Sequence, residues 1–224
     1  MEDFGQGVWT LQGVLKMAPG LALPIRSTVL ADRSGGIVVI SPIDGVASWG
    51  PEVAALGPVQ AVIAPSGLHH LFALPALQHF AGASCIASAA LQAKRPDFPS
   101  TTQWLAGESP VTVAPGIVAY PVLGMPTTQE WVFLHEPSGT LVVTDLLFHV
   151  LQPGFGLGVV QWLTGTYKKL GVSKLFTSGR KDRAAYDRSL AAIAALPFDR
   201  LVVAHGEPIG RRAHAQVSAA LGKA

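Results

Sequence analysis

The strongest constraint on the fold is a set of short apolar runs, each of strand length. VQAVIA (59–64) is apolar through its centre and is followed by turn residues, which is typical of a strand buried on both faces. Similar runs are ASCIASA (83–89), TLVVT (140–144) and RLVVA (200–204). Because a strand covered on both faces needs a layer on each side, the sequence predicts a sheet that lies between other elements.

Turn and helix signals organise the rest of the chain. Glycine and proline turns between paired apolar runs predict hairpins, and terminal prolines or apolar stripes predict helices. The elements expected in this way are hairpins over 25–43 and 129–148, two short strands within 111–123, and helices at 51–57, 75–80, 180–197 and 211–222. Strands alternating with helices, without a repeat or a linker, predict a single α/β domain over residues 1–224.

The composition fits a folded protein of a reducing compartment. Hydrophobic residues make up 49% of the 224 residues and charged residues only 13%, which argues against disorder. A net charge of +2, with scattered lysines and arginines, argues against a nucleic-acid partner. The single cysteine, Cys85, excludes an internal disulfide and is expected to be a buried thiol. Because the first ten residues lack a basic or apolar leader, we expect a cytoplasmic protein.

One segment raises the question of membrane contact. Residues 146–167 contain no acidic or basic residue apart from His149, and they are numerous enough to cross a bilayer. However, Pro153, closely spaced glycines and two glutamines break a helix and lower the hydrophobicity. We therefore expect a flexible apolar flap over a site, or a homodimer surface, at residues 150–163, and no membrane contact.

Polar residues that can bind a metal follow three of the apolar runs. They are His69 and His70 after VQAVIAPS, Asp145 after TLVVT, and His205 after RLVVA. Strand ends at one edge of a sheet converge, so these side chains are candidates for one site. Imidazole nitrogens with one carboxylate are an ordinary ligand set for zinc, iron or manganese. Each residue also has a structural interpretation, because histidine can bond loop carbonyls and aspartate can cap a turn.

In order and spacing, these residues resemble the metallo-β-lactamase fold superfamily, which has a His-x-His-x-Asp-His run after a strand. In APSGLHH, His70 aligns with the last histidine of that run and His69 with the aspartate, two positions that bind the family's second metal. VVTDLLF places Asp145 on the family's bridging aspartate, and VVAHGEPI places His205 on its final histidine. The same segments also resemble a branch of the superfamily that forms a domain of unknown function. The resemblance implies a four-layered αββα sandwich of two mixed β-sheets flanked by helices.

The sequence departs from this family at the ligands of the first metal. Their positions are occupied by Pro65, Gly67 and Gly124. The resemblance therefore implies at most one divalent metal, with zinc favoured over iron or manganese. The ligands that it leaves for this metal are His69, His70, Asp145 and His205.

One such site implies a metal-dependent hydrolase. It would act through metal-activated water on an unidentified small ester, thioester, lactone or phosphodiester. Four protein ligands close a zinc site, so activity would require five-coordination, a metal other than zinc, or one of the four residues standing off. If His69 stands off, it becomes a general base beside the water, with Asp145 as the other catalytic residue of the cluster. Glu207 is expected to orient His205 or to shuttle a proton. The alternative is a non-catalytic protein of the same fold, with an empty site and no cofactor, that serves as a binding or interaction module.

Overall fold

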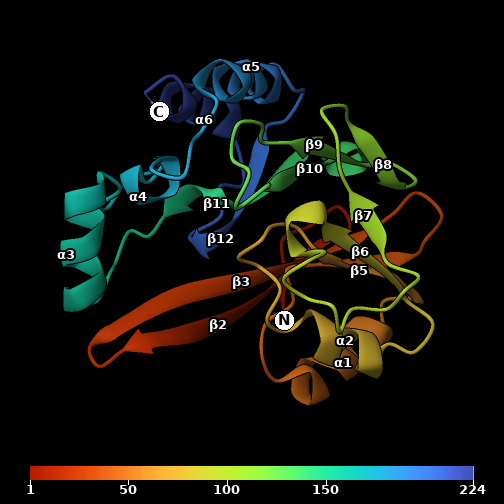
Figure 1. The fold of residues 1–224 in the computed structure, drawn as a ribbon. Helices are drawn as coiled ribbons and strands as arrows, with labels where there is room; N and C mark the ends of the chain where they lie inside the picture. Colours follow the sequence, from red (N-terminus) through yellow and green to blue (C-terminus); the bar gives the residue numbers. More distant parts are fainter. Residues whose placement is uncertain (224) are drawn as a thin grey trace.

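Two β-sheets face one another in the computed structural model, which describes residues 1–223 (Figure 1). The first sheet has the order β1-β2-β3-β4-β5-β6-β7, with β1 (Glu2–Asp3), β2 (Val8–Ala18), β3 (Leu21–Ala31), β4 (Ile37–Ile40), β5 (Val59–Ala64), β6 (Ser84–Ser88) and β7 (Gln103–Leu105). The second has the order β12-β11-β10-β9-β8, with β8 (Val111–Ala114), β9 (Ile117–Pro121), β10 (Trp131–His135), β11 (Thr140–His149) and β12 (Arg200–Gly206). The α-helices are α1 (Val46–Ala54), α2 (Ala73–His79), α3 (Phe155–Thr164), α4 (Lys174–Thr177), α5 (Arg183–Ala194) and α6 (Ala213–Leu221), with short 3-10 helices at Ala89–Leu91 and Glu136–Ser138.

The first sheet is antiparallel on one side and parallel on the other. β2 and β3 form a long hairpin, and β3 pairs antiparallel with β4, which confirms the hairpin predicted over residues 25–43. From β4 to β7 the strands are parallel, so their carboxyl ends meet at one edge. In β5, Ile63 packs between the two sheets and Val62 packs in the cluster with residues of α1 and α2. This strand is therefore covered on both faces, as its continuous apolar centre predicts.

The second sheet carries the other predicted hairpin. β10 pairs antiparallel with β11, and β11 pairs parallel with β12. Its inner face packs against the first sheet through Phe133 and Val142, while its outer face packs on α5 and α6 through residues such as Leu190 and Val217. Since α1 and α2 cover the far side of the first sheet, the four layers run helix, sheet, sheet, helix, as predicted (Figure 1).

The first helix does not begin where the sequence predicts. A proline near residue 51 favours a helix start there, but α1 spans Val46–Ala54, so Pro51 lies inside the helix. Gly45, in the left-handed region at φ +78°, turns the chain into the helix five residues earlier than expected. The other helices and strands that the sequence predicts start and end within about four residues of their expected positions.

The apolar segment at residues 150–163 is largely helical, so the prediction that its glycines break a helix is wrong. Pro153 precedes α3 and therefore does not interrupt it. A side chain on Gly156 would overlap the carbonyl oxygen of Gly20, at the turn of the β2–β3 hairpin. This glycine therefore allows the helix to pack closely on the hairpin. Among residues 1–223, no helix has the length and apolar character needed to span a membrane.

Candidate metal centre

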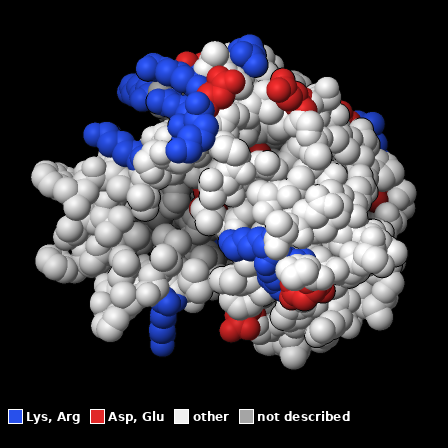
Figure 2. Space-filling view, viewed as in Figure 1, with Lys and Arg blue, Asp and Glu red and all other residues white. Residues whose placement is uncertain are grey.

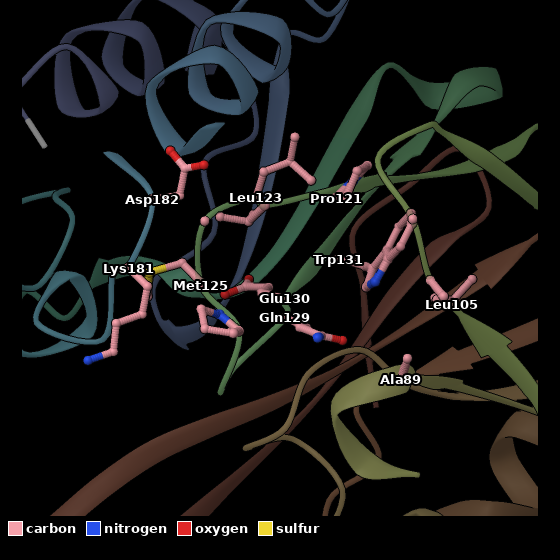
Figure 3. A pocket seen from close by; sticks show the side chains of 15 residues that line it. Ala89, Leu105, Pro121, Leu123, Met125, Gln129, Glu130, Trp131, Lys181 and Asp182 are labelled. Carbon is pink, nitrogen blue, oxygen red and sulfur yellow. The ribbon is translucent and has the colours of Figure 1, made fainter. Parts of the chain in front are cut away.

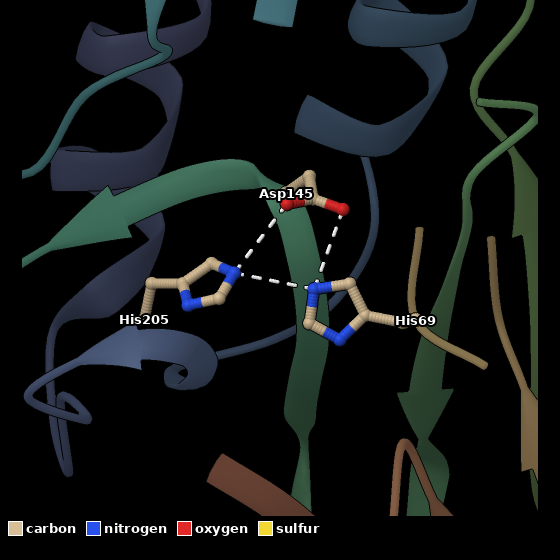
Figure 4. A group of neighbouring side chains, drawn as sticks. All are labelled: His69, Asp145 and His205. Atoms are coloured by element: carbon tan, nitrogen blue, oxygen red, sulfur yellow. Dashed lines mark hydrogen bonds and ion pairs between the residues drawn. The ribbon is translucent and has the colours of Figure 1, made fainter. Parts of the chain in front are cut away.

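Three of the predicted ligands lie together, although Asp145 lies within its strand and not after it, where the sequence predicts it. His69 lies in the loop after β5, Asp145 lies within β11, and His205 lies near the end of β12. β11 is bulged at this point, because its residues 144–147 lie opposite a single residue of β12. The bulge interrupts the ladder at Asp145, which is why its side chain can face the two histidines (Figure 4).

The side chains of these three residues converge on one point (Figure 4). Nε2 of His69 lies 3.3 Å from Oδ2 of Asp145, and Nε2 of His205 lies 3.4 Å from Oδ1 of the same carboxylate. The two Nε2 atoms are 3.2 Å apart. Among residues 1–223, this is the one group of three or more histidine, cysteine, aspartate or glutamate side chains with the spacing of a metal site.

An oxygen atom holds the other nitrogen of each imidazole. Nδ1 of His205 lies 2.9 Å from the carbonyl oxygen of Pro24, which can only accept a hydrogen bond. Nδ1 of His205 is therefore the donor, and in the neutral ring Nε2 carries a free lone pair. Nδ1 of His69 lies 2.7 Å from Oγ of Ser41, which fixes the second ring with Nε2 toward the cluster. Oxygen partners of this kind orient the histidines of metal sites.

The three donor groups fit a metal ion. Two imidazole nitrogens and a carboxylate face one another, and Oδ2 of Asp145 is buried without a hydrogen bond of good geometry from the described residues. Acceptors that converge in this way need a proton or a metal cation between them, because buried polar atoms are almost always paired. Histidine nitrogens and a carboxylate oxygen are ligands of catalytic zinc, and two histidines with one carboxylate also bind non-haem iron.

Charge couples His69 to Asp145. Burial alone would lower the pKa of His69, but the charge of Asp145 and the hydrogen bond to it raise that pKa above its ordinary value. Burial alone would raise the pKa of Asp145, but the two histidines hold it well below its usual range. A proton and a metal ion therefore compete for the same cluster, so metal affinity weakens in acid.

Two residues that the sequence did not single out support this cluster. The buried carboxylate of Glu130 accepts the backbone N–H groups of Thr144 (2.8 Å) and Asp145 (3.1 Å), which holds the bulge of β11. Burial and then the charge of Asp145 raise the pKa of Glu130 to about 8. Phe148 stacks on His205 with ring centroids 4.9 Å apart. An acidic residue at the start of an apolar strand was the available signal for Glu130, because carboxylates are buried only with partners.

The structure leaves His70 outside the cluster. Its Nδ1 lies 2.6 Å from a guanidinium nitrogen of Arg95, and its backbone carbonyl accepts a second bond from the same group. Burial and then the positive charges of Lys94 and Arg95 lower the pKa of His70 to about 4. The neutral ring is thus held by a cation from the segment after the Ala89–Leu91 3-10 helix, and three of the four expected ligands come together.

Glu207 also lies apart from the cluster. It is exposed, and its backbone N–H and carbonyl pair with the carbonyl and with Nδ1 of His149. The carbonyl of Pro24, rather than the carboxylate of Glu207, orients His205.

Solved structures that this chain resembles include metallo-β-lactamases. FIM-1 from Pseudomonas aeruginosa, in a mono-zinc form, matches with a TM-score of 0.66 and 15% sequence identity over 99% of this chain and 94% of its own. A metallo-β-lactamase from Erythrobacter litoralis matches with a TM-score of 0.69 and 16% identity over 100% of this chain and 96% of its own. The chain has the metallo-β-lactamase fold. No protein-family model and no curated protein matches its sequence.

Two loops in which metallo-β-lactamases are expected to hold the first metal are closed by glycine here. A side chain on Gly124, which has φ +73°, would overlap the carbonyl oxygen of Asp182. A Cβ on Gly67 would lie 2.6 Å from the carbonyl oxygen of Thr127. The backbone therefore packs where the resemblance places two histidines, and a histidine would fit only after a shift of the backbone.

A cavity of about 250 Å³ in this metallo-β-lactamase fold contains the cluster in its wall. Apart from the cluster, Ser41 and His70, its lining is apolar and includes Leu15, Met17, Leu23, Leu68, Leu71 and Phe72. A second cavity, of about 400 Å³, is lined by Glu130 together with residues such as Trp131, Met125 and Lys181 (Figure 3). Of these two cavities, only the first is lined by the three converging side chains.

Proposed function

We propose that this protein is a metal-dependent hydrolase with one divalent transition metal, zinc in the first place, held by His69, Asp145 and His205. The observation that carries the proposal is the convergence of two Nε2 atoms on a buried carboxylate whose Oδ2 has no hydrogen bond of good geometry from residues 1–223. FIM-1, a protein of the same fold, was solved in a mono-zinc form, which supports a site for a single ion. Iron and manganese remain the other metals that suit this donor set.

The number of ligands suits catalysis. Because His70 faces Arg95, three protein ligands remain, and three is the number that catalytic zinc sites use to leave one position open. A zinc ion bound there supplies Lewis acidity, which polarises a carbonyl oxygen and lowers the pKa of water. Of the two oxygens of Asp145, the one that does not bind the ion can accept a proton from the attacking water.

The cavity supports a substrate with an apolar group. Its lining contains no lysine or arginine, which disfavours the charged phosphate of a phosphodiester. Its volume of about 250 Å³ and its leucine-rich wall suit a short acyl chain. We therefore propose a small ester, thioester or lactone with an apolar acyl group as the substrate.

Metal analysis and a substrate panel test this proposal together. Protein purified without added metal or chelator is analysed for transition metals and then assayed with p-nitrophenyl butyrate, a butyryl thioester, an aliphatic lactone and bis-p-nitrophenyl phosphate. We expect about one ion per chain and hydrolysis of an acyl substrate, but not of the phosphodiester. His205→Ala should lose both the metal and the activity, whereas His70→Ala, the matched control, should keep the metal.

The opposite result would support the non-catalytic alternative. Metal-free protein whose thermal stability ignores both zinc and chelator, and which hydrolyses none of the four substrates, would overturn the proposal.

A further inference from the structure

α3 presents its apolar side to solvent. Phe155, Val159, Trp162 and Leu163 are 91%, 45%, 70% and 62% exposed. Their spacing of i, i+4, i+7 and i+8 places them on one stripe of the helix. On the buried side lies Gln161, whose amide oxygen and nitrogen have no hydrogen-bond partner among the described residues. A helix on the surface of a protein normally has the reverse arrangement, so this stripe is expected to be covered by another surface.

The apolar surface continues onto the tip of the β2–β3 hairpin. Gly156 of α3 is in close contact with the backbone of Gly20 at the turn of this hairpin, and nearby Val14 and Met17 are 64% and 59% exposed. Figure 1 shows α3 and the hairpin projecting on the same side of the molecule, and Figure 2 shows that side almost entirely in white. We call this surface the apolar face; its residues are Val14, Met17, Phe155, Val159, Trp162, Leu163 and Tyr167.

The two chain segments that carry the apolar face bear charges of one sign only. Residues 4–31 and residues 146–181 contain no aspartate or glutamate. The exposed lysines in these stretches include Lys16, next to Met17, and Lys168, Lys169 and Lys174, which follow α3. The Lys174 side chain reaches the end of the helix, where its Cε would lie 3.7 Å from a Cβ placed on Gly165. Figure 2 shows blue groups above and below the white projection.

A second copy of the chain fits this pattern poorly. In a two-fold contact between the same segments, the lysines of one copy would meet a surface whose own segments carry no carboxylate, so these charges would find no opposite partner there. An anionic membrane surface offers the complementary arrangement, with acyl chains for the apolar side chains and negative headgroups for the lysines. Tryptophan and tyrosine are the side chains that membrane interfaces favour.

We propose that the apolar face docks on a membrane surface that contains anionic phospholipid. The helix lies in the plane of the interface and does not cross it, since α3 has only 10 residues. This departs from the expectation of no membrane contact that the glycines and Pro153 gave in the sequence. Met17 belongs both to the apolar face and to the lining of the cavity with the metal cluster, so docking would bring that cavity close to the lipid. The proposal stands whether or not the cluster holds a metal.

Co-sedimentation of the full chain with vesicles tests the docking. The probes are vesicles of phosphatidylcholine alone and of phosphatidylcholine mixed with phosphatidylglycerol. We expect binding to the mixed vesicles and little binding to phosphatidylcholine alone, with a decrease as the salt concentration rises. Phe155→Ser combined with Trp162→Ser should abolish binding and leave the melting temperature unchanged, because both side chains are exposed.

Charge variants provide an independent arm with a matched control. Lys168→Gln with Lys169→Gln should lower the vesicle partition coefficient by about fivefold for each charge removed. Arg188→Gln removes an exposed charge on α5, away from the apolar face, and should change nothing. Absence of binding to the mixed vesicles would overturn the proposal. A dimer in sedimentation equilibrium that Phe155→Ser and Trp162→Ser dissociate would overturn it in favour of a second copy.

Discussion

His69 and His70 are neighbours in the chain, but they lie in two electrically opposite regions of the molecule. His69 faces Asp145, whose charge raises its pKa in spite of burial. His70 faces Arg95, and burial together with nearby lysine and arginine charges lowers its pKa to about 4. A histidine therefore becomes a ligand candidate through the charge that the fold places opposite it. Position in a sequence motif does not decide this.

The largest expected difference between the two histidines is in metal content. His69→Ala should reduce the bound zinc from near one ion per chain to near zero, because it removes one of three converging donors. His70→Ala should retain it, because that ring is bonded to Arg95. Elemental analysis of the purified variants measures this. Loss of metal in both variants alike would contradict the prediction that His69, and not His70, binds the ion.

Zinc should also stabilise one variant and not the other. At a free zinc concentration of about 100 times its dissociation constant, an ion that binds only the folded state adds about 2.7 kcal/mol to the free energy of unfolding. For a chain of this size, this corresponds to a rise of roughly 5–10 °C in melting temperature. We expect the rise in the wild type and in His70→Ala, its reversal by chelator, and no rise in His69→Ala. Equal melting curves with zinc and with chelator in the wild type would contradict stabilisation by a bound zinc ion.

A smaller effect is expected from the hydroxyl that holds the His69 ring. Ser41→Ala removes the oxygen 2.7 Å from Nδ1 and should weaken zinc binding by about 10- to 100-fold. Ser34→Ala is the matched control, since Ser34 is exposed and bonds Asp32 in a turn away from the cluster. Competition with a chromophoric chelator measures both affinities, and an unchanged affinity in Ser41→Ala would show that packing alone orients the ring.

The smallest expected effect is on the pH dependence of stability. The pKa of His70 in the folded protein, about 4, lies below the value of about 6.5 in the unfolded chain. Between these values the unfolded state binds more protons, so His70 lowers stability as the pH falls from about 6.5 to about 4. His69 has a raised pKa in the metal-free fold, so its contribution has the opposite sign and is lost as the pH rises.

Urea unfolding in the presence of chelator tests this prediction. His70→Asn should lose less stability than the wild type between pH 7 and pH 5. An identical loss in both proteins would mean that the His70 ring is solvated rather than held beside Arg95.

Much of the fold follows from local patterns. β5, β6 and β12 were predicted because continuous apolar runs indicate strands buried on both faces, and the β10–β11 hairpin because Pro137 and Gly139 mark its turn. The strand-end rule also brought together His69, Asp145 and His205, which lie up to 136 residues apart in the chain. These features depend on periodicity and topology, which a sequence displays directly.

Features that depend on long-range packing were not predictable in this way. Three contacts depend on segments that are far apart in the chain: Arg95 with His70, Ser41 with His69, and Pro24 with His205. No spacing rule encodes these contacts. Ser41 follows the β4 strand, so the strand-end rule could have found it, whereas the carbonyl of Pro24 has no signal in the sequence at all. The glycines of α3 predict a break in the helix, whereas Gly156 lets the helix approach the hairpin.

The bulge in β11 has a consequence for how this scaffold could be altered. Residues 144–147 project from the ladder between two stretches that keep their pairing with β12, and Glu130 secures them through its carboxylate. Adding or removing a residue within this bulge would move the carboxylate of Asp145 along the edge of the sheet while both sheets stay aligned. The length of the bulge is therefore an adjustable parameter, and a library of insertions in it offers a way to change which ion the site binds.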